Sequence, residues 1–312
     1  MHHRSPFVTV AVVAATVVVL AASACEPRDA PRTRGESAHA AIPAATAVTD
    51  DFGDTLMIGA PPRRIVSLNP ATTELFFALG AGARLIGRTR YDLYPAAALQ
   101  VPELGDGMRP NVEVVLGARP DLVVLYASNE NRDAVTRFRA AGIQTLSLRI
   151  DSIAEFRRAV MTIGRVIGDT VTARTVVDSV DRTLERVRAA TNDAPRPATF
   201  WKAWDSPVIA IGGGSFLTEL VTIAGGRNIY GDDPRPSLDV TIEDVVRRDP
   251  DVVLAGPESA RRMRAAAAWR ALRAVRENRV LIVDTMLVGR PGVRLGEAAV
   301  SLARLLHPGA LP

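Results

Sequence analysis

Few residues in this sequence of 312 amino acids can act as nucleophiles, bases or metal ligands. It has one cysteine, Cys25, and four histidines, which are His2, His3, His39 and His307. One cysteine cannot form an intrachain disulfide or a cysteine-rich metal site. The sequence contains neither a GxSxG nucleophile elbow nor an HExxH zinc motif. These absences predict a protein that is not an enzyme and has no resident metal or cofactor.

Paired carboxylates leave one enzymatic alternative open. Asp232-Asp233 and Glu243-Asp244 resemble acid–base pairs, but they stand in predicted turns or helix starts without a neighbouring base. A surface hydrolase is therefore the weaker hypothesis, and we expect a binding protein.

Aromatic side chains gather where predicted strands end. Tyr126 closes an apolar run at 122–126, and Trp201 and Trp204 lie at the end of a run at 199–203. Ligands of open α/β sheets bind outside the carboxyl ends of the strands, so these rings are candidate ligand contacts. The alternative for Tyr126 and one of the tryptophans is core packing.

Two polar features are candidates for holding an anionic group. Arg290 follows a strand predicted at 280–283, and its guanidinium fork suits a carboxylate, phosphate or hydroxamate oxygen. The alternative is a solvated loop charge. The run Gly212-Gly213-Gly214-Ser215 precedes a predicted helix and could present amides to an anion, although it lacks the spacing of a nucleotide loop.

The charge pattern argues against nucleic acid as a partner. The chain has 38 basic and 34 acidic residues, a formal net charge of +4. The basic residues are spread along the chain and are not interleaved with aromatics, as a nucleic-acid groove requires.

The N-terminus is typical of an export signal. Residues 1–24 have a basic start and an apolar run, and Ala22-Ser23-Ala24 then precedes Cys25 as in a bacterial lipobox. We expect a signal peptide over 1–24, a lipid on Cys25 and a flexible linker over 25–49. An ordinary signal or an uncleaved anchor is the alternative. In each case the body lies outside the cytoplasm, in the periplasm or at the cell surface.

The remaining sequence alternates short apolar runs with amphipathic stretches, which predicts an α/β fold. We expect an N-terminal α/β lobe over 50–150 and a C-terminal α/β lobe over 191–312. The predicted strands are 65–68, 122–126, 144–148, 199–203, 208–211, 252–254 and 280–283, and the predicted helices are 72–79, 131–141, 216–224, 242–248, 261–275 and 294–306.

Residues 151–190 have a different pattern. Apolar residues recur every three or four positions from Ile153 to Val187, with charges between them. The spacing predicts one long helix, or two nearly collinear ones, of up to about 38 residues and about 55 Å. A helix of this length is suited to bridging two lobes.

The two halves also echo each other. Glu113 stands seven residues before Pro120-Asp121, and Glu243 stands seven before Pro250-Asp251. Thr73-Glu74-Leu75 likewise corresponds to Thr218-Glu219-Leu220. The matching order favours two lobes related by a pseudo-twofold axis. The alternative is that α/β units in general share such short sequence patterns.

An ordered set of motifs carries a family resemblance over about residues 52–310. The set is Arg64-Ile-Val-Ser-Leu-Asn-Pro-Ala-Thr-Thr-Glu-Leu, Gly80-Ala-Gly-Ala, Tyr91-Asp-Leu-Tyr-Pro, Pro110-Asn-Val-Glu, Pro120-Asp-Leu-Val-Val, Gly225-Gly-Arg-Asn and Arg290-Pro-Gly-Val-Arg. The chain resembles the periplasmic substrate-binding proteins of iron-siderophore, haem and cobalamin ABC importers, of the BtuF-like class. The resemblance implies two Rossmann-like lobes joined by a single long backbone helix, with an iron- or B12-type binding domain at about 64–312.

The same resemblance implies partners and site residues. The family holds a small-molecule metal chelate between its lobes and delivers it to an ABC permease with its ATPase, as a monomer. Tyr91 and Tyr126 match aromatic ligand positions, although core packing is the alternative for each. Glu113 and Glu243 match acidic residues that dock on permease arginines, and the alternative is a helix-start carboxylate beside the caps Asn111 and Thr241.

Flat aromatic faces suit a corrin, a porphyrin or a catecholate. The pattern around Asn69 and Tyr91 favours a corrinoid such as cobalamin, with a ferric siderophore or haem as alternatives. Gly105 and Ser237 depart from corrinoid binders, which often carry tryptophan at these positions. A lipoprotein that senses or scavenges its ligand without a permease is the remaining alternative.

Overall fold

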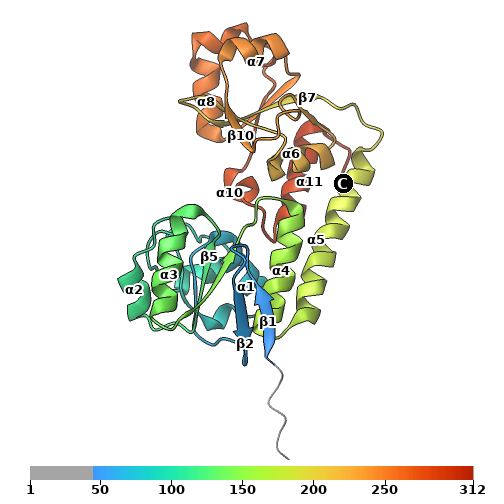
Figure 1. Ribbon diagram of the computed structural model, residues 1–312. Coiled ribbons are helices and arrows are strands. Elements are labelled where there is room, and N and C mark those ends of the chain that lie inside the picture. The colour runs from blue at the N-terminus through green and yellow to red at the C-terminus, as the bar shows by residue number, and fades with distance from the viewer. Residues whose placement is uncertain (1–44, 312) are drawn as a thin grey trace, which may run out of the picture. The chain divides into compact units, whose positions relative to one another are not determined.

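The first lobe is built on a four-stranded parallel sheet. The structure is a computed structural model that describes residues 45–311 (Figure 1). The strand order is β4-β3-β5-β6. The strands are β3 (Ile65–Ser67), β4 (Leu85–Gly87), β5 (Leu122–Tyr126) and β6 (Gln144–Leu148). The bounds of β5 and β6 are those predicted from the sequence.

Capped helices connect these strands. The α-helices are α1 (Pro70–Ala78), α2 (Val112–Gly117) and α3 (Arg132–Ala140), and short 3₁₀ turns cover Gly82–Arg84, Ala96–Gln100 and Asn129–Asn131. Asn69 accepts a hydrogen bond from the amide of Ala71, and Pro70 follows it. A side-chain cap followed by proline starts a helix, so α1 begins directly after β3.

The second lobe carries a mixed sheet of order β10-β8-β7-β11-β12, with β9 also paired to β7. Strands β9, β11 and β12 run parallel to β7, whereas β8 is antiparallel to both of its neighbours. The strands are β7 (Ala198–Trp204), β8 (Ile209–Ile211), β9 (Arg227–Asn228), β10 (Ser237–Asp239), β11 (Val252–Ala255) and β12 (Val280–Ile282).

The helices of the second lobe follow the predicted order with one correction and with one helix, α10, that was not predicted. They are α6 (Phe216–Ile223), α7 (Ile242–Arg248), α8 (Pro257–Ala265), α9 (Arg273–Arg276), α10 (Thr285–Val288) and α11 (Leu295–Leu306). The single helix predicted at 261–275 is wrong. Helix α8 ends at Ala265, and a 3₁₀ turn at Ala267–Ala271 buries Trp269 before α9 begins.

The N-terminal hairpin corrects the predicted linker. Strands β1 (Thr46–Thr49) and β2 (Thr55–Ile58) pair antiparallel, and Val48, Leu56 and Ile58 are buried in the core. Residues 46–49, predicted as the end of a linker, are therefore folded. The predicted signal peptide at 1–24 and the predicted lipidation site, Cys25, lie outside the described residues.

Residues 151–190 form two helices that pack side by side. Helix α4 spans Ile153–Ile167 and α5 spans Thr170–Thr191, and Gly168 between them has a φ of +80°. That left-handed conformation favours glycine and ends α4. Figure 1 shows the two helices lying next to each other. The prediction of one rod, or of two collinear helices, is therefore wrong.

Contacts along α4 and α5 show that they run antiparallel. Arg157 in α4 pairs with Asp181 in α5 at 2.8 Å. Near the turn, a Cβ added to Gly164 would lie 2.5 Å from the Cβ of Ala173, so the two backbones approach closely there. Helix α5, with 22 residues and thus about 33 Å long, is the long helix that leads from the first sheet into the second.

Both sheets are covered on both faces. Along β5, Leu122 and Val124 pack on the face of α1 and α4, whereas Val123 and Leu125 pack on the opposite face with residues of α2 and α3. This alternation follows from the two-residue period of a strand. The cluster around α4, α5 and α11 includes core residues of both lobes, which belong to one compact unit. The predicted fold class of two α/β lobes is confirmed, whereas the helix pair α4–α5 takes the place of the single long backbone helix.

The internal echo has a structural counterpart. The carboxylate of Asp121 accepts hydrogen bonds from the amides of Arg63 and Arg64, just before β3. Asp251 accepts one from the amide of Ala198, the first residue of β7. The Pro-Asp turns thus anchor the start of the first sheet strand in each lobe.

Candidate functional site

An apolar pocket lies at the carboxyl ends of β3 and β5. It has a volume of about 240 Å³ and contains both tyrosines that the resemblance singled out. We call it the tyrosine pocket, and its lining residues are Leu68, Asn69, Pro70, Thr89, Tyr91, Asp106, Gly107, Met108 and Tyr126. Tyr91 and Met108 are half exposed, which leaves a ring and a thioether available to a ligand.

A buried polar network shapes the loop that carries Tyr91. Asp92 accepts hydrogen bonds from the hydroxyls of Thr73, at 2.5 Å, and Thr89. The guanidinium of Arg88 donates to the carbonyls of Val101 and Thr89. Burial raises the pKa of the Asp92 carboxyl, and these two hydroxyls act in the opposite direction. The loop is therefore fixed from inside, and its exposed side is left to Tyr91.

Tyr126 and Gly107 complete the wall. The hydroxyl of Tyr126 donates to the carboxylate of Asp151 at 2.7 Å, so its polar end is satisfied while the ring lines the pocket. Burial and this hydrogen bond raise the pKa of Tyr126. Any Cβ at Gly107 would lie 2.1 Å from the carbonyl oxygen of Leu68, so only glycine allows these two segments to approach.

The two predicted tryptophans have different environments. Trp201 is 4% exposed and packs in the core on the face of β7 opposite to Phe200, so the core interpretation describes it. Trp204, at the end of β7, is 62% exposed and offers its ring to solvent. We carry only Trp204 forward as a ligand candidate on the second lobe.

A charged network stands beside Trp204. Lys202, the only lysine in the sequence, is buried and pairs with Asp205, and it donates to the hydroxyl of Ser259 at 2.8 Å. Arg262 pairs with the other oxygen of Asp205 at 2.6 Å. Burial lowers the pKa of Lys202 to about 8, and the nearby Arg262 acts in the same direction. The network ties the end of β7 to α8.

Arg290 is engaged within the protein. Its guanidinium lies 3.5 Å from the buried carboxylate of Glu74 on α1 and donates to the carbonyl of Tyr91 at 3.4 Å. The solvated-loop alternative does not describe it, since only about a fifth of its side chain is exposed. Instead of facing a free ligand site, Arg290 joins the two lobes beside the tyrosine pocket.

The glycine run at 212–214 is also occupied. The amides of Gly212, Gly213 and Gly214 donate to the carbonyls of Pro236, Asp233 and Arg235. They are not available to an anion, so the anion-binding hypothesis for this run is wrong. The glycines are required because an added Cβ on any of them would lie within 2.4 Å of a backbone oxygen.

Glu113 and Glu243 occupy equivalent positions. Each is the second residue of a short helix, α2 or α7, whose cap accepts an amide hydrogen bond: Asn111 from Val114 and Thr241 from Asp244. Both carboxylates are exposed. Glu113 pairs with Arg137 at 2.8 Å, whereas Glu243 has no ion-pair partner among residues 45–311.

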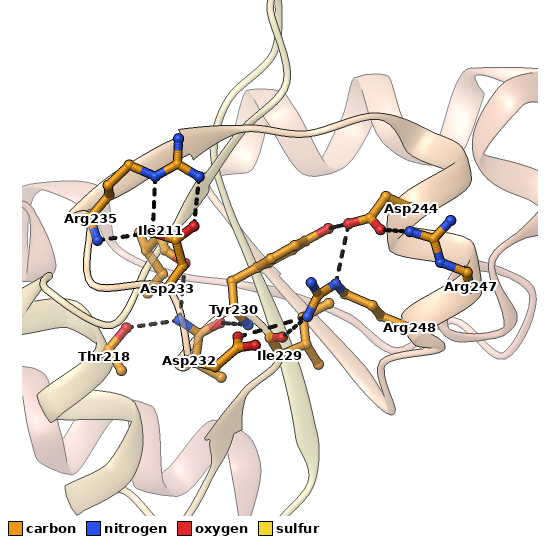
Figure 2. A network of polar contacts seen from close by, with 11 residues as sticks. Ile211, Thr218, Ile229, Tyr230, Asp232, Asp233, Arg235, Asp244, Arg247 and Arg248 are labelled. Atoms are coloured by element: carbon orange, nitrogen blue, oxygen red, sulfur yellow. Dashed lines mark hydrogen bonds and ion pairs between the residues drawn. The ribbon is translucent and has the colours of Figure 1, made fainter.

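Figure 2 shows how α7 is held. The hydroxyl of Tyr230 points to Asp244 and donates to it at 2.7 Å, and Arg248 donates to Asp244 at 3.2 Å. The guanidinium of Arg248 also lies 4.3 Å from the centre of the Tyr230 ring. The hydrogen bond from Tyr230 is the main cause that lowers the pKa of Asp244. Glu243, the preceding residue, thus stands on a helix with a fixed orientation.

Sequence reasoning missed several residues of this region. Glu74 and Asp92 are buried acids, and Met108 is an exposed apolar side chain. The one available signal was the correspondence between Glu74 and Glu219, because a glutamate within an apolar helix needs a partner. Met108 stands in a segment without regular structure, where periodicity gives no information.

Other features of the described chain do not compete for this role. A hollow of about 660 Å³ lies along α5 and α11, away from the strand ends. Among residues 45–311 there is no cluster of three or more acidic, histidine or cysteine side chains fit for a metal. No helix in this range is both long and apolar enough to cross a bilayer.

Comparisons with known proteins agree with this architecture. The sequence profile of the family described as "Periplasmic binding protein" matches residues 65–286. The chain is 29% identical over 269 residues to the uncharacterized ABC transporter substrate-binding lipoprotein YvrC of Bacillus subtilis, covering 84% of this chain and 85% of the relative. It is 30% identical over 323 residues to a cobalamin-binding protein of Halobacterium salinarum, with coverage of 98% and 85%.

A solved structure shares the fold. The haem-binding protein RhuT of Roseiflexus superposes with a TM-score of 0.72 at 23% identity, covering 80% of this chain and 99% of RhuT. The family profile spans most of both sheets described above. The chain therefore belongs to the periplasmic binding protein family.

Proposed function

We propose that the chain is the substrate-binding component of an ABC importer and that it captures a metal chelate, with a corrinoid such as cobalamin as the first candidate. The observation that carries the proposal is the tyrosine pocket, where Tyr91 and Tyr126 line an apolar surface at the carboxyl ends of parallel strands. The cobalamin-binding relative from Halobacterium salinarum supports the choice of ligand.

The chemistry of the pocket suits a flat, largely apolar ligand. A half-exposed ring gains buried area when a planar ligand stacks on it, and the thioether of Met108 adapts to an irregular contour. Trp204 provides a further exposed ring on the second lobe. A pocket of about 240 Å³ encloses only part of a corrin, so the remainder of the ligand would contact other surfaces.

Haem is the second candidate, because RhuT, a haem-binding protein, shares the fold. The described part of the chain has one histidine, His307, which contacts the carbonyl of Gly225 and is not among the residues that line the tyrosine pocket. A bound haem or corrinoid would therefore be held without axial histidine ligation from this pocket. A ferric siderophore is the third candidate.

We further propose that Glu113 and Glu243 dock the loaded protein on a permease. Exposed ion pairs contribute only about 0–1 kcal/mol each, so two such contacts set orientation and association rate more than affinity. Glu113 must exchange Arg137 for a permease cation, whereas Glu243 needs no exchange. A lipid on Cys25 would hold the protein at the outer face of the membrane, with the lobes at 50–150 and 191–312 free to bind ligand.

A titration of the purified chain tests the ligand class. Cyanocobalamin, haemin and ferrichrome are added separately, and the fluorescence of its tryptophans is followed. We expect saturable quenching by cyanocobalamin at micromolar concentration or below. If only haemin or only ferrichrome gave saturable quenching, that compound and not a corrinoid would be the ligand class. No saturation by any of the three would contradict metal-chelate capture, and a normal uptake rate in cells lacking the chain would favour a scavenger.

A further inference from the structure

A short segment of the second lobe closes over a buried acid of the first lobe. Residues 290–294 lie between α10 and α11. Arg290 contacts the Glu74 carboxylate at 3.5 Å, and the guanidinium of Arg294 lies 4.0 Å from the centre of the Tyr94 ring. Gly292 covers Glu74 so closely that an added Cβ would be 3.0 Å from Oε2. One pentapeptide thus makes three contacts with the other lobe.

These contacts converge on the loop that forms the tyrosine pocket. Arg290 also donates to the carbonyl of Tyr91, whose side chain lines the pocket. Asp92, the next residue, binds the hydroxyl of Thr73, which precedes Glu74 on α1. The loop at 91–94 is therefore bounded by α1 on one side and by the segment 290–294 on the other.

We propose that the segment Arg290–Arg294 is a proton-sensitive latch, which holds the second lobe on the first at Glu74 and makes Arg290 a positioning residue for Tyr91. The latch itself is a property of the ligand-free chain. Only its consequence for ligand capture rests on the proposed function.

The environment of Glu74 makes such a latch sensitive to protons. Glu74 is 1% exposed, and its Oε1 has no hydrogen-bond partner among the described residues. Burial raises its pKa to about 7, while Arg290 and Arg294 act in the opposite direction and Asp92 and Glu297 raise it further. Four charged residues on the elements packed on α1 have other partners: Arg84 donates to carbonyls, Glu155 accepts from the amide of Asp151, Arg157 pairs with Asp181 and Arg158 pairs with Asp51. Arg165, at the far end of α4, is not among the groups that shift the pKa of Glu74.

The direction of the effect follows from linkage. Since Gly292 and Arg290 cover Glu74, separating them lets water reach the carboxylate and returns its pKa toward 4.5. The closed contact then binds the proton more tightly than the open one, so acidification favours closure. With pKa values of about 7 closed and 4.5 open, the closing equilibrium rises about tenfold from pH 8 to pH 6.

A corresponding residue provides the matched control. Glu219 on α6 corresponds to Glu74 in the sequence echo, and it also contacts the other half, accepting from the amide of Ile153 at 3.4 Å. Unlike Glu74, it is exposed. Glu219→Gln therefore removes a carboxylate at the equivalent position without changing a buried acid.

Hydrogen–deuterium exchange of the full-length, ligand-free chain tests the latch. The readout is the amides of Asp92 and Leu93, which donate to the carbonyls of Thr89 and Tyr91. In Arg290→Met we expect about tenfold faster exchange there, with β5 and β11 unchanged. Arg290→Lys keeps the charge, and we expect it to speed exchange of the same amides about threefold. This variant decides the test if Arg290→Met does not fold. Unchanged exchange, or a uniform increase over the whole chain, would overturn the latch.

The proton arm uses the wild type, Glu74→Gln and Glu219→Gln at pH 6 and pH 8. Rates are corrected for the intrinsic pH dependence of exchange. In the wild type and in Glu219→Gln, the amides of Asp92 and Leu93 are then expected to exchange about tenfold more slowly at pH 6 than at pH 8. In Glu74→Gln, the corrected rates are expected to be equal at the two pH values. A flat wild-type profile would overturn the proton sensitivity. Both exchange experiments are made without ligand. A negative result in them would overturn the latch but not metal-chelate capture. A negative titration with cyanocobalamin, haemin and ferrichrome would overturn metal-chelate capture but not the latch.

Discussion

Replacing Glu74 with glutamine is expected to change how the stability of the chain depends on pH. The Glu74 pKa is raised from 4.5 to about 7 by burial. Its unfolded form therefore loses its proton at lower pH than the folded form does. The contribution of Glu74 to stability is therefore greatest below about pH 4.5 and is lost as pH rises through 7.

The size of the effect follows from the shift. One pKa unit corresponds to about 1.4 kcal/mol, so the full shift from 4.5 to about 7 amounts to about 3.5 kcal/mol, of which about 3 kcal/mol falls between pH 4.5 and pH 8. Glu74→Gln removes this penalty and keeps a side chain of similar volume. Relative to the wild type, the variant is expected to gain about 3 kcal/mol of unfolding free energy between pH 4.5 and pH 8.

Urea unfolding followed by circular dichroism at pH 4.5, 6, 7 and 8 measures this difference. Glu219→Gln is the control, because its carboxylate is exposed and the variant should follow the wild-type profile. Parallel wild-type and Glu74→Gln profiles across this range would refute the reasoning. They would show that water or a rearranged partner stabilises the ionised Glu74.

Three further predictions concern docking, packing and the tryptophans. Glu113→Arg together with Glu243→Arg is expected to abolish uptake in cells while the Kd for ligand in solution is unchanged, and an equal loss of binding would show that these residues are not docking contacts. Gly107→Ala is expected to destabilise the chain by about 1–3 kcal/mol in urea unfolding, because its Cβ would lie 2.1 Å from a carbonyl oxygen, and an unchanged midpoint would contradict this. In the same assay, Trp201→Ala is expected to lower the unfolding free energy by about 3–5 kcal/mol, because the ring is buried, and Trp204→Ala by less than about 1 kcal/mol, because the ring is exposed. Similar losses for the two variants would contradict this difference in burial.

Local patterns predicted the central strands of both sheets, whereas the short strands β4, β9 and β10 were not predicted. Strands β5 and β6 have their predicted bounds, and α7 spans the predicted residues 242–248. Residues that interrupt regular structure delimit these elements: Pro120 and Gly142 stand two residues before β5 and β6, and Pro250 stands two residues after α7. Tyr91 and Tyr126, which the family resemblance matched to aromatic ligand positions, line the same pocket.

Tertiary contacts explain what the patterns missed. The turn at Gly168 was not predicted, because a helical period continues through it, and the hairpin shows only in tertiary contacts such as Arg157 with Asp181 and Gly164 with Ala173. The sequence does not show that Arg290 pairs with Glu74 and is not a ligand contact, because the two residues are more than 200 positions apart. Likewise, both faces of β7 are covered, but only as far as Lys202, and the strand period does not show where this cover ends, so it could not separate Trp201 from Trp204.

The tyrosine pocket is tested most directly by calorimetric titration of cyanocobalamin into the wild type and Tyr91→Ala. Stacking on a half-exposed ring buries roughly 100 Å² and contributes about 2 kcal/mol, so the Kd should rise about thirtyfold. Met57→Ala, which removes an equally exposed side chain from the distant β1–β2 hairpin, should leave it unchanged. If Tyr91→Ala binds cyanocobalamin as tightly as the wild type does, the ligand does not use this pocket.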